Sequence, residues 1–159
     1  MKTLVTRGVF LVFLYLGHLC FAESSIPVSW EKLGELNYES GEMSESLSQL
    51  NNQIVEVSGF IVPLEMDGYI DTVKEFLLVP NPLACIHVPP PPPNQMVFIK
   101  MKKSIPLDMD FRGVAIRGLL TISKPKKENS FVSYEIEGFF AKEANIEVED
   151  PMMEFLQKI

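Results

Sequence analysis

The sequence predicts a mainly β domain: a five-stranded antiparallel barrel of the oligonucleotide/oligosaccharide-binding (OB) type with short flanking helices. Five runs of strand-forming residues follow one another along the chain, separated by Pro, Gly or polar turn residues. Three of these runs contain a glycine, at Gly59, Gly118 and Gly138, which permits the bulges and tight bends by which a short sheet closes on itself. The composition, with 47% hydrophobic and 22% charged residues, is that of an ordinary globular domain. An open sheet or a sandwich is the competing architecture.

The strands are expected at Ile54–Val62, Glu75–Val79, Met96–Met101, Gly113–Ile122 and Phe131–Phe140. In the first of them Val55, Val57 and Ile61 alternate with the side chains of the other face, as in a strand with one face in the core. The second and third are continuous apolar runs, typical of strands that are buried on at least one side. The last two are joined by a polar loop, residues 124–130, and this arrangement predicts a β-hairpin.

Short helices are expected on both sides of the barrel. Trp30 and two leucines recur at three-residue spacing within residues 29–36, which predicts a turn of helix whose tryptophan closes one end of the core. A second amphipathic helix is expected within residues 42–50. A last short helix is expected at the C-terminus, where Asp150 suits the capping position and Pro151 the first helical position.

Residues 1–22 have the pattern of a secretory signal peptide. Lys2 and Arg7 precede an unbroken apolar run, which ends near small residues at Cys20 and Ala22 that suit cleavage after Ala22. The run is shorter than the roughly 20 residues that cross a bilayer, so we expect no stable transmembrane segment once the signal is removed. An uncleaved anchor and a lipid anchor on Cys20 are the alternatives, and the residues before Cys20 do not fit a lipoprotein. The pattern predicts a periplasmic protein.

The mature chain divides into a polar leader with a short helical turn, residues 23–41, and a single OB-like barrel domain, residues 42–159. Removal of the signal leaves 137 residues and takes away two cations and no anion, so the formal net charge falls from -7 to -9. A sequence pI of about 4.9 argues against nucleic acid as a partner, because neutralising phosphates needs a surplus of Lys and Arg. The mature chain keeps one cysteine, Cys85, and one histidine, His87, with a single residue between them.

Cys85 and His87 lie in a segment that is unusually rich in proline. Seven of the twelve prolines fall within residues 79–95, five of them consecutive at Pro89–Pro93. Each proline fixes φ and pushes the preceding residue toward extended geometry, so the segment is stiff before it binds anything. In an extended segment, residues two apart point the same way, with their Cβ atoms about 6 to 7 Å apart. One metal ion is then within reach of both the thiol and the imidazole.

Three segments of the chain resemble an exported bacterial family of unknown function, DUF3299. They are Gly-Phe-Ile-Val-Pro-Leu-Glu at 59–65, Phe-Leu-Leu-Val-Pro at 76–80, and the run from Ala-Cys-Ile-His to Asn-Gln at 84–95. The resemblance covers most of the mature chain, and its Cys-x-His-x-Pro-rich segment is quite specific. The family has no established activity, but its members are often encoded beside ABC transporters, in gene clusters that respond to zinc shortage. The resemblance therefore implies metal homeostasis, with ABC transporter components or another exported metal-binding protein as partners.

The first hypothesis for function is a transition-metal site. The thiolate of Cys85 and the neutral imidazole of His87 bind one ion, helped by a carboxylate from Glu65 or Asp67 or by a second subunit. Zinc is the first choice. Copper(I) is less favoured: the eight methionines could add soft thioether ligands, but most are expected to fill the core. Two ligands from one chain leave the site open and exchangeable, as an accessory of a transporter requires.

Two alternatives come from other classes of protein. In the first, His87 activates the thiol of Cys85 and the chain is a thiol enzyme or a redox protein, with Glu65 or Asn94 orienting the imidazole. In the second, Cys85 is a small buried hydrophobe and the chain is a non-catalytic interaction module. The sequence has no Cys-x-x-Cys pair, phosphate-binding glycine loop, metalloprotease pattern or serine elbow, so catalysis is not favoured.

Overall fold

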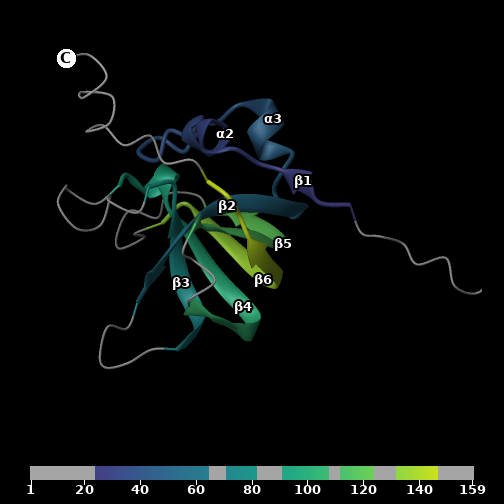
Figure 1. The fold of residues 1–159 in the computed structure, drawn as a ribbon. Helices are drawn as coiled ribbons and strands as arrows, with labels where there is room; N and C mark the ends of the chain where they lie inside the picture. Colours follow the sequence, from purple (N-terminus) through teal and green to yellow (C-terminus); the bar gives the residue numbers. More distant parts are fainter. Residues whose placement is uncertain (1–23, 65–70, 82–90, 108–111, 124–131, 147–159) are drawn as a thin grey trace, which may run out of the picture.

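The computed structural model describes residues 24–64, 71–81, 91–107, 112–123 and 132–146 (Figure 1). In chain order the elements are β1 (Ile26–Pro27), α2 (Trp30–Gly34), α3 (Glu45–Ser48), β2 (Ile54–Pro63), β3 (Thr72–Val79), the 3-10 helix η2 (Pro93–Gln95), β4 (Val97–Pro106), β5 (Val114–Ile122) and β6 (Tyr134–Glu143). The two-residue strand β1, which the sequence pattern does not predict, runs parallel to β2. The helix expected from Asp150 onward lies outside the described residues.

Strands β2 to β6 form a closed barrel. Their order is β2-β3-β4-β6-β5, and β5 pairs with β2 again. The prediction of a mainly β, five-stranded OB-like barrel with short flanking helices is confirmed. The expectation that every pair is antiparallel is wrong at one place, because β4 and β6 run parallel. A ring of five strands cannot alternate in direction all the way round, so at least one neighbouring pair must run the same way.

The interior of the barrel is filled by side chains that alternate along the strands. On β2, Val55, Val57 and Ile61 are buried and belong to the core, as the sequence predicts. The other strands contribute Phe76, Leu78, Val97, Ile99, Ile116, Leu120, Tyr134 and Ile136 to the same cluster. Complete burial of one such side chain stabilises the fold by about 1.5 to 3 kcal/mol, so this cluster holds the barrel together.

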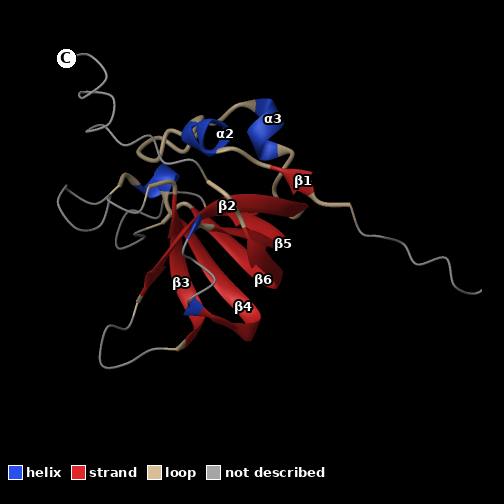
Figure 2. Cartoon of the chain, viewed as in Figure 1, coloured by secondary structure: helices blue, strands red, loops and turns tan. Residues whose placement is uncertain are grey.

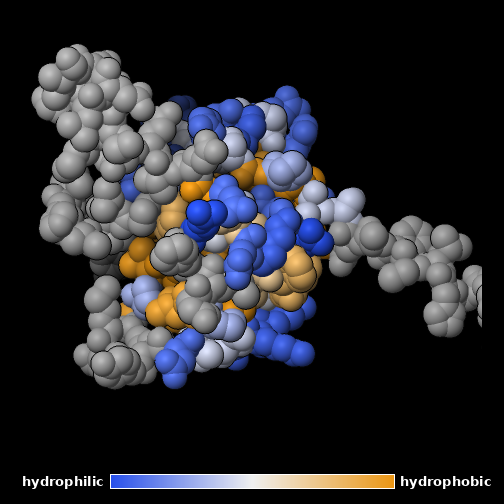
Figure 3. Space-filling model, in the orientation of Figure 1, coloured by the Kyte–Doolittle hydropathy of each residue, from blue (hydrophilic) through white to orange (hydrophobic). Residues whose placement is uncertain are grey.

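Helices α2 and α3 lie together at one end of the barrel (Figure 2) and fall within the predicted ranges. The hydroxyls of Ser29 and Ser44 cap them by accepting a backbone amide three residues further on. Leu33 and Leu47, one from each helix, are fully buried in the core. Tyr134 donates its hydroxyl to the carbonyl of Leu33 at 2.5 Å, and its burial raises the pKa of the phenol. The outward faces of both helices are hydrophilic, as Figure 3 shows.

A bulge between β5 and β6 allows the strands to approach closely. The register shifts so that Arg117 pairs with Phe140 whereas Gly118 pairs with Gly138. A Cβ atom on Gly118 would overlap the backbone of Glu137, so a larger residue does not fit there without a shift of the strand. These two glycines therefore permit a bulge in a curled sheet, as the sequence predicts.

Charged side chains bridge the strands at the seam where β5 returns to β2. Glu56 of β2 lies 2.9 Å from a guanidinium nitrogen of Arg117 and 2.9 Å from Nζ of Lys142. Hydrogen bonds from Lys142 and then from Arg117 lower the pKa of Glu56. The guanidinium of Arg117 also lies 5.1 Å from the centre of the Phe140 ring. The carboxylate thus ties three strands together across the seam.

We expect Glu56→Gln to destabilise the barrel by about 1 kcal/mol at neutral pH, because it removes a carboxylate shared by two cations. A carboxyl whose pKa is lowered on folding contributes stability above its unfolded pKa of about 4.3, and this contribution is lost as the pH falls through the lower folded pKa. The difference in unfolding free energy between the two proteins should therefore be present at pH 7 and vanish toward pH 3. Urea unfolding at both pH values measures it.

The matched control is Glu75→Gln. Its carboxylate forms one ion pair, 3.2 Å from Nζ of Lys100, and both side chains are about half exposed. The substitution should cost less than about 0.5 kcal/mol. An equal cost of Glu56→Gln at pH 7 and at pH 3 would show that packing, and not charge, stabilises the seam.

Candidate functional site

The predicted metal-site residues fall outside the described part of the chain. Cys85 and His87 lie within residues 82–90, and Glu65 and Asp67 within residues 65–70, so their side chains are not placed. The structure does describe the strand ends from which both loops depart (Figure 1). These strand ends show how far apart the two loops begin.

The two loops begin at the ends of neighbouring strands. Residues 65–70 follow the end of β2 and precede β3, whereas residues 82–90 follow the end of β3. Pro63, the last residue of β2, pairs with Phe76, three residues before Val79, so at a rise of about 3.3 Å per residue the two strand ends lie about 10 Å apart along the sheet. Strand geometry alone therefore neither places a carboxylate of the first loop beside the thiol of the second nor keeps the two apart.

Both ends of the proline-rich segment, residues 79–95, are fixed at the end of the barrel where α2 lies. Leu78 and Val97, which flank the segment, are directly paired across β3 and β4. The last three residues of the segment form η2, which lies beside α2. The segment is therefore held at its two ends by neighbouring strands of one hairpin.

Two amide side chains tie η2 to α2. Asn94 Nδ2 donates to the carbonyl of Leu36 at 2.8 Å and to that of Gly34 at 3.3 Å. Gln95 Nε2 donates to the carbonyl of Trp30 at 3.2 Å. A helix as short as α2 leaves most of its carbonyls without partners inside the helix, and these amides supply them. Asn94, which the thiol-enzyme alternative offers as a group to orient His87, thus has its amide nitrogen engaged, while its Oδ1 is buried without a hydrogen-bond partner among the described residues.

Trp30 lies against β2 at the point where β2 changes partners. Its Nε1 donates to the carbonyl of Ser58 at 2.7 Å. The residues of β2 up to Gly59 pair with β5, and the later ones pair with β3. A Cβ atom on Gly59 would lie 3.0 Å from the indole ring and 2.7 Å from the carbonyl oxygen of Val79. The absence of a side chain at this position lets both Trp30 and β3 approach β2 closely.

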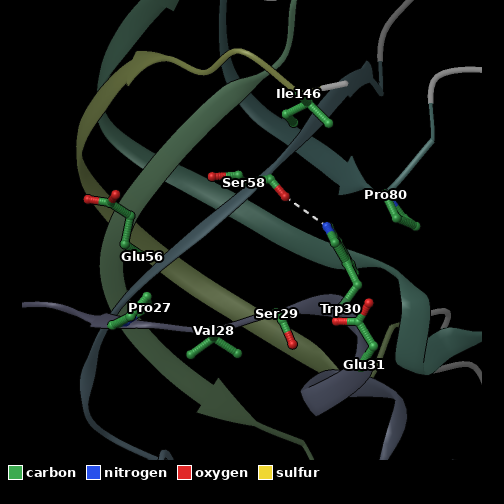
Figure 4. Close-up of a pocket in the computed structure, with 9 residues that line it drawn as sticks. All are labelled: Pro27, Val28, Ser29, Trp30, Glu31, Glu56, Ser58, Pro80 and Ile146. Carbon is green, nitrogen blue, oxygen red and sulfur yellow. Dashed lines mark hydrogen bonds between the residues drawn. The ribbon is translucent and has the colours of Figure 1, made fainter. Parts of the chain in front are cut away.

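A cavity of about 400 Å³ opens beside Trp30, between the segment that joins β1 to α2 and the outer face of β2 (Figure 4). Its walls combine the indole with the apolar side chains of Pro27, Val28, Pro80 and Ile146. Pro80 is the first residue after β3, so the cavity adjoins the start of the proline-rich segment.

The polar part of the cavity consists of two carboxylates and two hydroxyls, from Glu31, Glu56, Ser29 and Ser58. A hydrogen bond from the Ser29 hydroxyl lowers the pKa of Glu31, and the two cations of the seam lower the pKa of Glu56. Both carboxyl groups are therefore ionised at neutral pH. Of the described residues that line the cavity, none carries a positive charge.

This cavity is not visible in the sequence pattern. The spacing of apolar residues predicts Trp30 as a seal for the core, and its ring does pack at the edge of the core. Its second role, as a wall of the cavity, depends on Ser58 and Pro80, which come from distant parts of the chain. The only sign of the cavity in the sequence is a tryptophan followed by a glutamate within the polar leader.

Two features are absent from the part of the chain that the structure describes. No group of three His, Cys, Asp or Glu side chains within it is placed to hold a metal ion. None of its helices combines the length and the apolar character needed to cross a bilayer.

We expect Gly59→Ala to lower the free energy of unfolding by about 1 to 3 kcal/mol, as overpacked sites do, because the added methyl meets backbone as well as the indole. The emission of Trp30, the only tryptophan of the chain, should shift in the folded protein, since its ring is displaced from Ser58. Urea unfolding followed by tryptophan fluorescence measures both effects.

Gly34→Ala is the matched control for this substitution. A Cβ atom there would meet only the side-chain nitrogen of Gln95, at 3.1 Å. Alanine favours a helix over glycine by up to about 1 kcal/mol, which offsets the close contact with this flexible side chain, so the free energy of unfolding should change less than in Gly59→Ala. If Gly59→Ala alters neither stability nor emission, the packing assigned to Trp30 is incorrect.

Comparison with known proteins identifies the family. A model described as "Protein of unknown function (DUF3299)" matches residues 29–142. The crystal structure of a DUF3299 family protein from Pseudomonas aeruginosa PAO1 is similar, with a TM-score of 0.57 and 25% identity over 79% of this chain and 99% of that chain. A putative aspartyl-tRNA synthetase from Leishmania major Friedlin, at 10% identity over 91% of this chain and 27% of that chain, has a TM-score of 0.38, too low to support a shared fold. No curated protein matches the chain.

The matched region begins at the residue that caps α2 and ends within β6. It therefore contains both helices, the barrel and the proline-rich segment, and it confirms the family resemblance seen in the sequence. Because the family model spans most of the sequence, the chain belongs to the DUF3299 family of proteins of unknown function.

Proposed function

We propose that this DUF3299 protein is an exported accessory that binds a transition-metal ion, zinc first, through Cys85 and His87. The observation that carries the proposal is the position of these residues, the only thiol and the only imidazole of the mature chain, two positions apart in a segment with seven prolines. A proline-rich segment has little conformational entropy to lose on ordering. Two ligands on such a segment can bind one ion with a small loss of conformational entropy.

The anchoring of the segment supports this proposal. Its flanking residues are paired across β3 and β4, and Asn94 and Gln95 bind its end to α2. A segment held at both ends can occupy fewer positions than a free one. Ligand residues on rigid supports hold a metal ion in a defined geometry, whereas those on free chain ends do not.

Thiolate and neutral imidazole are ligands that suit zinc, and copper(I) is the less favoured ion. Zinc prefers four ligands, so two residues leave positions for water, a partner protein or a carboxylate. The third group is a carboxylate from Glu65 or Asp67 or a ligand from a second subunit. A site of this kind exchanges its ion readily.

The proposed location is the periplasm, and the proposed partner is an ABC transporter component or another exported metal-binding protein. The location is supported by the signal-like pattern of residues 1–22. The partner is the one that the family resemblance implies. An open, exchangeable site suits delivery of an ion to a transporter, because the receiving protein can complete the ligand set.

Expressed with its full sequence in a Gram-negative host, the protein is expected in the periplasmic fraction with Glu23 as its first residue, because signal peptidase cuts after a small residue. Ala22→Arg should block the cut and leave a chain of higher mass. Mass spectrometry of the cell fractions measures both. Accumulation of the uncleaved wild-type chain in the cytoplasm would overturn the proposed location.

The mature protein is expected to bind zinc at a ratio near one ion per chain. Cys85→Ala and His87→Ala should each weaken binding by about tenfold or more, because each removes one of few ligands. Competition with a chromophoric chelator measures the affinity, and urea unfolding shows whether each variant folds. Glu65→Gln tests the carboxylate, with Glu137→Gln, an exposed carboxylate on β6, as the matched control that should bind like the wild type.

The other outcomes distinguish the alternatives. A wild-type protein that binds no zinc overturns the metal proposal. If it also reacts with iodoacetamide at pH 7 faster than a free thiol does, the thiol-enzyme alternative is supported. If Cys85→Ala changes neither metal content nor reactivity but lowers the unfolding free energy, Cys85 is a buried structural residue and the interaction-module alternative is supported.

A further inference from the structure

We infer that the cavity beside Trp30 binds an organic cation, an ammonium group carried on an apolar body. The inference goes beyond the proposed metal site, because it uses described residues alone and requires neither Cys85 nor His87. Three properties of the cavity carry it: an aromatic wall held in a fixed position, further apolar walls, and a carboxylate, Glu31, for which no ion pair with a described residue is found.

The indole of Trp30 is held in place by the protein itself. Its N–H group donates to the carbonyl of Ser58 at 2.7 Å, and the missing side chain at Gly59 lets the ring lie on β2. Because the N–H group is already satisfied, the indole offers the cavity its π surface. Tryptophan is the side chain whose π face attracts cations most strongly.

Glu31 determines the sign of the charge that the cavity accepts. Glu56 is paired with both Arg117 and Lys142, each at 2.9 Å, so these three side chains together carry no negative charge. Glu31 receives a hydrogen bond from the Ser29 hydroxyl, and it forms no ion pair with any residue that the structure describes. The uncompensated charge of the cavity therefore lies on Glu31, the residue that directly follows Trp30 in α2.

The remaining walls distinguish an organic cation from a metal ion. The side chains of Pro27, Val28, Pro80 and Ile146 offer no ligand atoms, so a hydrated metal ion gains little from them. An alkyl chain, in contrast, gains about 0.8 kcal/mol for each methylene group buried. A volume of about 400 Å³ is within the range of small-molecule sites. The ammonium group can come from a free amine or from a lysine side chain of a partner protein.

Titration with choline, followed by fluorescence, tests the inference. Trp30 is the only tryptophan of the chain, so its emission reports on this cavity alone. The comparison ligand is 3,3-dimethylbutanol, which has nearly the same shape as choline but no charge. We expect choline to bind at least about fivefold more tightly than this alcohol. The same additions to N-acetyltryptophanamide correct for direct quenching.

Substitution of the uncompensated carboxylate provides the second part of the test. Glu31→Gln should weaken choline binding by about threefold or more and leave the binding of the neutral alcohol unchanged. The matched control is Glu45→Gln, which changes a carboxylate in the first turn of α3, outside the cavity, and should bind both ligands like the wild type. Cys85→Ala should also bind choline like the wild type, which separates a failure here from a failure of the metal proposal.

The peptide Gly-Lys-Gly amide identifies the source of the ammonium group. If it binds more tightly than choline, the ligand is a side chain of a partner protein; if choline binds more tightly, the ligand is a free amine. Equal affinities for choline and 3,3-dimethylbutanol would overturn the inference. So would the absence of any effect of Glu31→Gln, or the absence of choline binding to the wild-type protein.

Discussion

Closure of the barrel depends on β2, which pairs along both of its edges. Residues Ile54–Gly59 pair with β5 and residues Phe60–Pro63 pair with β3. The return of β5 to β2 turns an open sheet into a ring and places β6 between β5 and β4. Since the ring has five members, one pair must be parallel, and this pair is β4 with β6. The core that fills the barrel depends on this closure.

The change of partners along β2 also creates the surroundings of the cavity. Before Phe60 the edge of β2 that later pairs with β3 is covered by β1 and by Trp30. Three residues of β2 make the contacts around the cavity. Glu56 binds the cations of the seam, Ser58 accepts a hydrogen bond from the indole N–H group, and Gly59 leaves room for the ring. The end of β3 and the start of the proline-rich segment lie against the same place, because Pro80 lines the cavity.

Periodic apolar patterns predict most of the barrel, since alternation of side chains is a property of each strand by itself. The prediction of 54–62 for the first long strand agrees with β2 to within one residue. The next strand begins at Thr72 and not at Glu75, because its pattern is interrupted at a register shift between Val73 and Glu75. The parallel pair follows from the odd number of strands, but no residue pattern shows which pair it is.

The candidate site is less predictable for a different reason. The spacing of Cys85 and His87 is a local property that the sequence shows directly. The distance to a third ligand depends instead on how two loops fold, one beginning at the end of β2 and the other at the end of β3. The anchoring amides of Asn94 and Gln95 have partners about 60 residues away, so a local pattern cannot identify them. The cavity likewise joins Trp30 to residues of β2 and to Pro80, and it exists only once the barrel has closed.

The topology has a consequence for the order in which the chain folds. Strands β2, β3 and β4 follow one another and pair locally, but Ile54 pairs with Leu119, 65 positions further along, and Val97 with Tyr134, 37 positions further along. Bringing such distant residues together costs conformational entropy, and domains dominated by such contacts fold more slowly than those with local contacts. Until β5 and β6 have docked, β2 and β4 present open edges to other chains. The docking of the β5–β6 hairpin is therefore the step that covers the edges of both β2 and β4.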